Sequence, residues 1–296
     1  MTSQDSFGGA WTREKLECLQ DYLRAYMKIL EKHSYFRTIY VDAFAGTGVI
    51  PLKTQKEQGV LEELEIEVEA FLKGSATIAL EIAPTFNEFR FIEKNVEKAQ
   101  ELETLRRKFP YKAETIHIIA QDANTYLPQW IESVNWRKTR AVVFLDPYGM
   151  QIEWQLLETI AKTKGVDLWL LVPIGMGVNR MMTKEGLPPQ AWQDRLTRFL
   201  GTDEWKERFY KPAPVEARGL FDEDAQSVKV ANYAALEQYF VERLQPLFGK
   251  ECVAPKPLTQ YNSHNSPMFL LCFASANPTG VKIAHHLLTR KKKGSK

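Results

Sequence analysis

The feature that most constrains the fold is a repeated alternation of short apolar runs with stretches of helical periodicity between residues 38 and 174. The apolar runs are rich in β-branched and aromatic residues, which is typical of buried strands; they cover residues 38–45, 88–92, 115–120, 141–145 and 166–172. The stretches between them have apolar positions at helical spacing, at residues 75–83, 96–109, 125–133 and 154–162. Strands that alternate with helices predict an α/β fold with a mostly parallel sheet between two layers of helices.

One insertion interrupts the alternating region: residues 58–73 are interpreted as an inserted acidic helix. The flanking regions are predicted to be mainly helical. Near the end of the chain, residues 253–261 and 268–274 are interpreted as two strands joined by a turn-rich loop. We therefore expect a single domain over residues 1–296. Its expected parts are an N-terminal helix at 12–32, a cofactor-binding core at 38–174, a helical insert at 175–250, and a closing antiparallel hairpin with a last helix at 251–290.

Composition excludes several classes of protein. There are 39 Lys and Arg residues against 37 Asp and Glu, so nucleic-acid binding would have to come from a local basic patch. The cysteines Cys18, Cys252 and Cys272 form no Cys-x-x-Cys pair, which argues against a zinc site and fits a reducing compartment. His285 and His286 lack a third ligand at metal spacing, so we expect no metal. Without a long apolar run, the chain is expected to be soluble and cytoplasmic.

A turn of small residues follows the first predicted strand. The residues involved are Asp42, Ala43, Phe44, Gly46 and Gly48, and their small size lets a cofactor lie against the backbone. A nicotinamide-binding loop would need G-x-G-x-x-G, but Pro51 stands three residues after Gly48. The spacing therefore disfavours a dehydrogenase.

Acidic residues end the next three strands. Glu93 and Lys94 follow the second strand, Asp122 and Ala123 the third, and Asp146 the fourth. The carboxyl ends of parallel strands share one edge, which is where open α/β sheets bind ligands. Glu93 is suited to the two hydroxyls of a ribose, and Asp122 with Ala123 to an adenine edge. The set predicts a nucleoside cofactor pocket, and the alternative for each acid is a cap on the following helix.

The segment Asp146-Pro147-Tyr148-Gly149 is the candidate catalytic turn. An exocyclic amine is a weak nucleophile, and acceptors such as the Asp146 carboxylate and the Pro147 carbonyl can orient its lone pair toward a methyl donor. Tyr148 offers a ring on which a planar target can stack. The alternative is a structural turn that needs only Pro and Gly. Arg180, after the fifth strand, is a candidate contact to substrate phosphate or carboxylate.

Five segments together resemble the three-Cys-motif partner proteins (TcmP), a group of class I methyltransferase-like proteins that depend on S-adenosylmethionine. They are Tyr40 to Gly48, Gly74 to Leu80, Phe91 to Lys94, Asp146 to Gly149 and Phe273 to Gly280, and the opening Trp11-Thr-Arg-Glu-Lys15 also fits. The resemblance implies a Rossmann-like, seven-stranded methyltransferase fold. It also implies that Asp42, Phe44, Gly46 and Gly48 form the first cofactor loop, with Glu93 at the ribose and Asp122 at the adenine of S-adenosyl-L-methionine. A gene-neighbour three-Cys-motif protein is then an expected partner.

A narrower resemblance concerns the acceptor. Leu145-Asp-Pro-Tyr-Gly149 is similar to the catalytic motif of tRNA guanine-N2 dimethyltransferases, and less so to the Asp-Pro-Pro-Tyr of adenine-N6 enzymes, because Tyr148 replaces the second proline. The expected function is methyl transfer to an exocyclic amine of a nucleic-acid base. The alternatives are a non-catalytic cofactor-binding scaffold and a small-molecule or protein methyltransferase.

Overall fold

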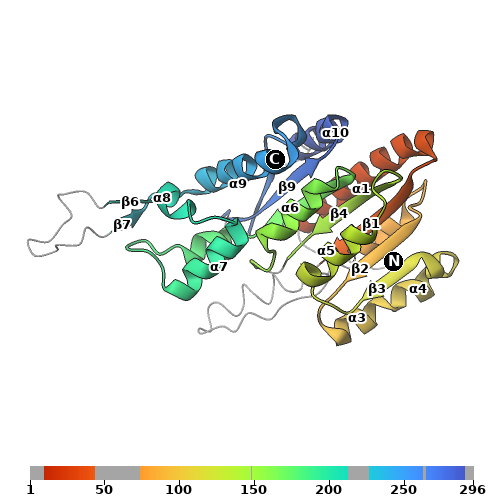
Figure 1. Ribbon diagram of the computed structural model, residues 1–296, viewed down its shortest axis with the longest axis horizontal. Coiled ribbons are helices and arrows are strands. Elements are labelled where there is room, and N and C mark those ends of the chain that lie inside the picture. Colours follow the sequence, from red (N-terminus) through yellow and green to blue (C-terminus); the bar gives the residue numbers. More distant parts are fainter. Residues whose placement is uncertain (1–9, 44–73, 148, 213–226, 263–264, 291–296) are drawn as a thin grey trace, which may run out of the picture.

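The main element of the protein is a seven-stranded sheet (Figure 1). The computed structural model describes residues 10–43, 74–147, 149–212, 227–262 and 265–290. Its strands are β1 (Arg37–Ala43), β2 (Glu88–Ile92), β3 (Ile116–Ile119), β4 (Thr139–Leu145), β5 (Val166–Val172), β8 (Leu258–Tyr261) and β9 (Pro267–Ser275). The order across the sheet is β3-β2-β1-β4-β5-β9-β8. The first five are parallel, and β9 is antiparallel to both of its neighbours.

This strand order confirms the predicted fold class. The segment β3-β2-β1-β4-β5 is the Rossmann-like order. An antiparallel last strand inserted beside β5 is the arrangement of the class I methyltransferase fold. The strands form because the chain supplies apolar side chains at consecutive positions for two covered faces: every residue of β5 is buried, as are six of the seven in β1.

Helices cover both faces of the sheet. One face carries α1 (Ala10–Leu30), the helical residues 74–81 and α10 (Pro278–Thr289), and it includes Tyr40 of β1 and Trp169 of β5. The other carries α5 (Ala123–Ser133), α6 (Trp154–Lys162) and α9 (Tyr233–Phe248), and it includes Val41 of β1. Alternate residues of each strand thus serve two separate apolar cores.

The remaining elements are short. They are the 3₁₀ segments η1 (Glu31–His33), η2 (Pro110–Thr115) and η5 (Lys250–Cys252), the helices α3 (Val96–Leu102), α4 (Thr104–Lys108), α7 (Gln190–Leu200) and α8 (Trp205–Phe209), the π-helical η3 (Ile174–Asn179), and the strands β6 (Tyr210–Pro212) and β7 (Ser227–Lys229). The region 175–250 therefore contains a two-stranded sheet as well as helices. The helix predicted at 96–109 is divided at Glu103, which caps both α3 and α4. The acidic helix predicted at 58–73 lies outside the described residues.

The structure also describes the cysteines and the character of the helices. The three cysteines are free, with Cys18 and Cys272 buried. Across the described ranges, no helix combines the length and the apolar character that crossing a membrane requires.

Candidate functional site

The carboxyl ends of β1 to β4 form one edge of the sheet. Ala43, the last residue of β1, pairs with Ile92 on one side and with Leu145 on the other. The backbone continues this pairing, because Glu93 N donates to Ile119 O at 2.9 Å and Asp146 N donates to Ala43 O at 3.4 Å. The predicted strand-end residues therefore lie along a common edge.

A buried ion pair lies at the end of β4. Lys15 of α1 donates a hydrogen bond from Nζ to Asp146 Oδ2 at 3.2 Å, and both side chains are almost fully buried. Burial raises the pKa of Asp146, and Lys15 opposes that rise. The sequence analysis did not assign Lys15 to the site, because a lysine in an amphipathic helix is usually exposed.

Asp42 lies on the same face of the sheet as this pair. Its Oδ2 accepts hydrogen bonds from Ser75 Oγ at 2.6 Å and from Tyr40 OH at 3.3 Å. Its Oδ1 is buried and has no hydrogen-bond partner among the described residues. Burial raises the pKa of Asp42 to about 7; the bond from Ser75 opposes this, and the negative charge of Asp146 adds to it. Ser75 also was not predicted, although it follows Gly74 in a segment that carried the family resemblance.

The second group of predicted residues lies at the ends of β2 and β3. The buried Glu93 accepts a hydrogen bond from Asn95 N at 2.5 Å, and burial raises the pKa of its carboxyl. Lys94 pairs with Asp122 across 3.0 Å and joins the two loops. Ala123 is the buried first residue of α5.

Asp122 has a capping role as well. It is the N-cap of α5, where its Oδ1 accepts from Asn124 N at 2.9 Å. Burial tends to raise the pKa of Asp122, but the hydrogen bonds from Lys94 and Asn124 N outweigh it and lower the pKa overall. Both the predicted strand-end position and the alternative capping role therefore apply to this residue.

The loop after β4 is held against α5. Asn124 donates from Nδ2 to Gln151 O at 2.8 Å, and its Oδ1 accepts from Glu153 N at 3.0 Å. Gly149 has a φ of 77°, a conformation that favours glycine. Of the predicted residues in this region, Asp146 and Pro147 are described, whereas Tyr148 lies outside the described residues. Phe44, Gly46 and Gly48 of the first cofactor loop likewise lie outside them.

The region after β5 contributes basic residues, and one of them lies beside this loop. Exposed Arg180 caps the end of η3. Lys229 fixes η3 by donating from Nζ to Asn179 O at 2.8 Å, to Asn179 Oδ1 at 2.6 Å and to Met182 O at 3.2 Å. Arg195 of α7 was not predicted; its Nη2 lies 3.9 Å from the position that a Cβ on Gly149 would take.

Nothing in the described part of the chain forms a metal site: no group of three or more His, Cys, Asp or Glu side chains there could hold an ion. The chemistry that these residues offer is therefore that of carboxylates, one buried ammonium and nearby guanidinium groups.

The chain was compared with protein families, with curated proteins and with solved structures. No family model matches the chain, and no curated protein matches it. Among solved structures, the chain is similar to "Putative methyltransferase yhhF" from Escherichia coli, with 10% sequence identity, 86% of each chain covered and a TM-score of 0.28. A TM-score this low carries no argument, so the fold assignment depends on the strand order described above.

Proposed function

We propose that this protein is an S-adenosylmethionine-dependent methyltransferase that acts on an exocyclic amine of a nucleic-acid base. The observation that carries the proposal is the ordered row of carboxylates at one sheet edge, on strands in the Rossmann-like order. The row consists of Asp42, Glu93, Asp122 and Asp146. Ligands bind at this edge in open α/β sheets, so a nucleoside cofactor is the natural occupant.

The charges in the site fit a cationic cofactor. Asp42 and Asp146 are buried carboxylates close enough to influence one another, and Lys15 forms its ion pair with Asp146. The buried Asp42 Oδ1 has no partner among the described residues, so it can accept a hydrogen bond from an ammonium group. Glu93 would accept the ribose hydroxyls, and Asp122 with Ala123 would face the adenine. The cofactor supplies the methyl group from its sulfonium.

The turn after β4 is proposed to hold the acceptor amine. The Asp146 carboxylate and the Pro147 carbonyl accept hydrogen bonds from the amine and so direct its lone pair, while Tyr148 stacks on the base. Burial raises the pKa of Asp146, and the pair with Lys15 opposes that rise. Arg180, which caps η3, and Arg195, which lies beside Gly149, are proposed to contact phosphates of the substrate.

The motif resemblance extends this proposal to a family and a partner. We propose membership of the three-Cys-motif partner proteins and an association with a three-Cys-motif protein. The segments that support it include Gly74 to Leu80, which contains the Ser75 that bonds Asp42. Pull-down with the gene-neighbour protein tests this part separately from the chemistry.

Calorimetric titration with S-adenosylmethionine and S-adenosylhomocysteine tests the cofactor site. Loss of a hydrogen-bonded carboxylate should weaken binding about ten-fold or more, so we expect that change in Glu93→Gln. The matched control is Glu97→Gln, an exposed residue at the start of α3, which should bind as the wild type does. Absence of binding by the wild-type chain would refute the proposal.

Transfer of a labelled methyl group to RNA, DNA, protein and small amines then identifies the acceptor. Transfer to a base amine supports the proposed reaction. Cofactor binding without transfer to any acceptor would support the scaffold alternative. Transfer to protein or small amines would support a protein or small-molecule methyltransferase.

A further inference from the structure

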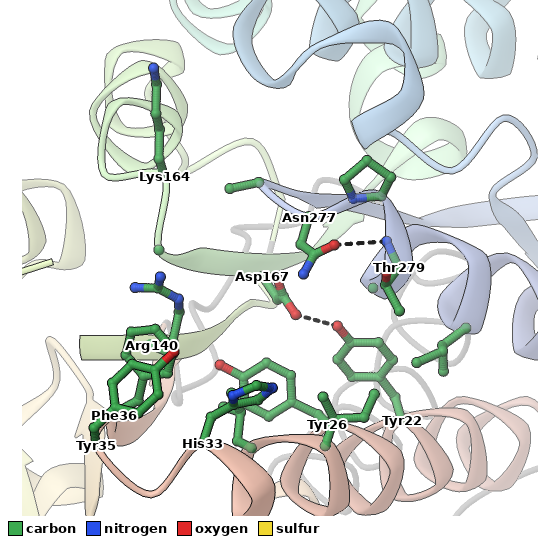
Figure 2. A pocket seen from close by; sticks show the side chains of 17 residues that line it. Tyr22, Tyr26, His33, Tyr35, Phe36, Arg140, Lys164, Asp167, Asn277 and Thr279 are labelled. Carbon is green, nitrogen blue, oxygen red and sulfur yellow. Dashed lines mark hydrogen bonds between the residues drawn. The ribbon is translucent and has the colours of Figure 1, made fainter. Parts of the chain in front are cut away.

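A cavity lies at the opposite edge of the sheet, where β4 and β5 begin. It has a volume of about 450 Å³, is open to solvent on one side, and is lined by α1, the segment after it, the starts of β4 and β5, and the start of α10 (Figure 2). Arg140 at this edge precedes Asp146 by six residues of strand and turn, which corresponds to roughly 20 Å. The cavity is therefore separate from the proposed cofactor site.

The only carboxylate that lines the cavity, within the described residues, has both oxygens occupied. Asp167 Oδ2 accepts a hydrogen bond from Tyr22 OH, and its Oδ1 accepts one from Ser275 Oγ. Figure 2 shows Tyr22 pointing from α1 to Asp167. Because these hydroxyls satisfy its oxygens, Asp167 serves as an internal acceptor rather than as a ligand for a cation.

Several donors around the cavity have no acceptor among the residues that the structure describes. Tyr26 OH is buried and makes no hydrogen bond with any described residue. Arg140 uses only Nη1, which donates to Trp136 O and Thr139 O, so its Nε and Nη2 remain unused by the described residues. Asn277 accepts from Thr279 N through Oδ1 and leaves its Nδ2 without a described acceptor. Tyr26 OH is the buried member of this set, and an unsatisfied buried donor is costly. Arg140 is half-buried and Asn277 is exposed, so their unused donors are accessible to a ligand that supplies acceptors.

The positive charge around the cavity also favours a negatively charged ligand. Arg140 lines the cavity beside its aromatic rings. Lys164 and His33 also line it, but both are exposed, and Figure 2 shows the Lys164 ammonium directed away from the rings. The first turn of the 12-residue helix α10 adds its positive end at Asn277 and Pro278. Burial raises the pKa of both Tyr26 and Asp167, and the charge of Arg140 opposes the rise in each, which places the guanidinium close to both side chains.

The walls are aromatic and aliphatic. Tyr26 and Phe36 line the cavity beside Tyr35, and the Arg140 guanidinium carbon lies 3.9 Å from the centroid of the Phe36 ring. Ile29, Leu30 and Ile283 complete the apolar surface. Flat rings stack well on such surfaces, so the apolar part of a ligand here is expected to be planar.

We propose that this cavity is a binding site for a small aromatic anion, either a carboxylate or a phosphate monoester. The acid group accepts hydrogen bonds from Arg140, Tyr26 OH and Asn277 Nδ2, and the ring packs against the aromatic wall. Such a ligand satisfies the unused donors and balances the positive charge in one step.

Calorimetric and NMR titrations of the full chain with benzoate, phenyl phosphate and neutral benzyl alcohol test the proposal. We expect saturable one-site binding of at least one anion, with benzyl alcohol at least ten-fold weaker because it lacks the charge. The tighter of the two anions identifies the source of the acid group as carboxylate or phosphate. Equal binding of benzyl alcohol, or no binding of either anion, would overturn the proposal.

Two variants locate the site. Tyr26→Phe removes a hydroxyl that makes no described hydrogen bond, so the fold should persist while anion binding weakens about ten-fold. Arg140→Gln should weaken it further. The control is Tyr111→Phe, which alters a fully exposed hydroxyl on η2 and should leave binding unchanged. Should Arg140→Gln fail to fold, Tyr26→Phe alone decides, and wild-type affinity in that variant would exclude this cavity.

Discussion

Lys15 Nζ lies 3.2 Å from Asp146 Oδ2, and the two side chains are 0% and 2% exposed. The pair joins the first helix to the end of β4 across 131 positions of the sequence. A charge buried this completely is stable only with its partner. Helix α1 therefore contributes a residue, Lys15, to the candidate site.

Breaking this pair should destabilise the protein strongly. Lys15→Met leaves a buried carboxylate without its counter-charge, which costs about 3–5 kcal/mol of unfolding free energy. Urea unfolding measures the effect, with Lys28→Met on the exposed side of α1 as the control. The double variant Lys15→Met/Asp146→Asn should recover part of the loss, because it removes the unpaired charge. A double variant no more stable than Lys15→Met would contradict the ion-pair interpretation.

Asp42 should make stability fall as pH rises. Its folded pKa is about 7 against an ordinary 3.8, so between those values the folded chain holds a proton that the unfolded chain has released. Its contribution is therefore greatest below about pH 4 and decreases until about pH 7. Asp42→Asn should remove this slope and raise the unfolding free energy at pH 8 relative to wild type.

Chemical denaturation at about pH 4 and pH 8 provides the measurement. One pKa unit corresponds to about 1.4 kcal/mol, so a gain at pH 8 that exceeds the gain at pH 4 by at least that much is expected. Asp194→Asn, at an exposed position of α7, should show no such difference. An unchanged slope in Asp42→Asn would show that the carboxyl titrates normally.

Gly201 and Gly186 form a matched pair of left-handed glycines. Their φ angles are 72° and 66°, but a Cβ on Gly201 would lie 2.1 Å from Trp154 Cγ, whereas one on Gly186 meets nothing within 4 Å. Gly186→Ala should cost only the backbone strain, about 1–2 kcal/mol. Gly201→Ala should cost a further 1–3 kcal/mol, roughly, because Trp154 must move. Equal melting temperatures for the two variants would be inconsistent with this close contact.

Arg180 and Arg195 should contribute to nucleic-acid binding through phosphates. Replacing both with Gln should weaken binding of a single-stranded RNA oligonucleotide and reduce the slope of log K against log salt by about 1.4, or 0.7 per contact. Fluorescence anisotropy between about 50 and 200 mM salt measures the slope. Arg24→Gln with Lys28→Gln, both exposed on α1, is the charge-matched control. A slope that changes equally in both double variants would argue against a specific phosphate contact.

The central sheet was predictable because most residues of its central strands are apolar. The runs at 88–92 and 166–172 coincide with β2 and β5, and the helical spacing at 154–162 coincides with α6. The ribbon of β6 and β7 was not predicted. Its strands have three residues each, and only Tyr210 of the six is buried, so neither apolar content nor alternation distinguishes them from a loop.

For the candidate site, the sequence by itself determined which residues end the strands. Glu93, Asp122 and Asp146 follow apolar runs, and parallel strands must bring such residues to one edge. Only the tertiary structure decided their environments. Lys15 became a buried counter-ion because α1 packs over the end of β4. Asp42 acquired a pKa of about 7 mainly because it is buried, and the charge of Asp146 adds to that rise. The protonation of these groups depends on their burial and on their distances to residues far apart in the chain. A local pattern of residue types indicates neither the burial nor the distances.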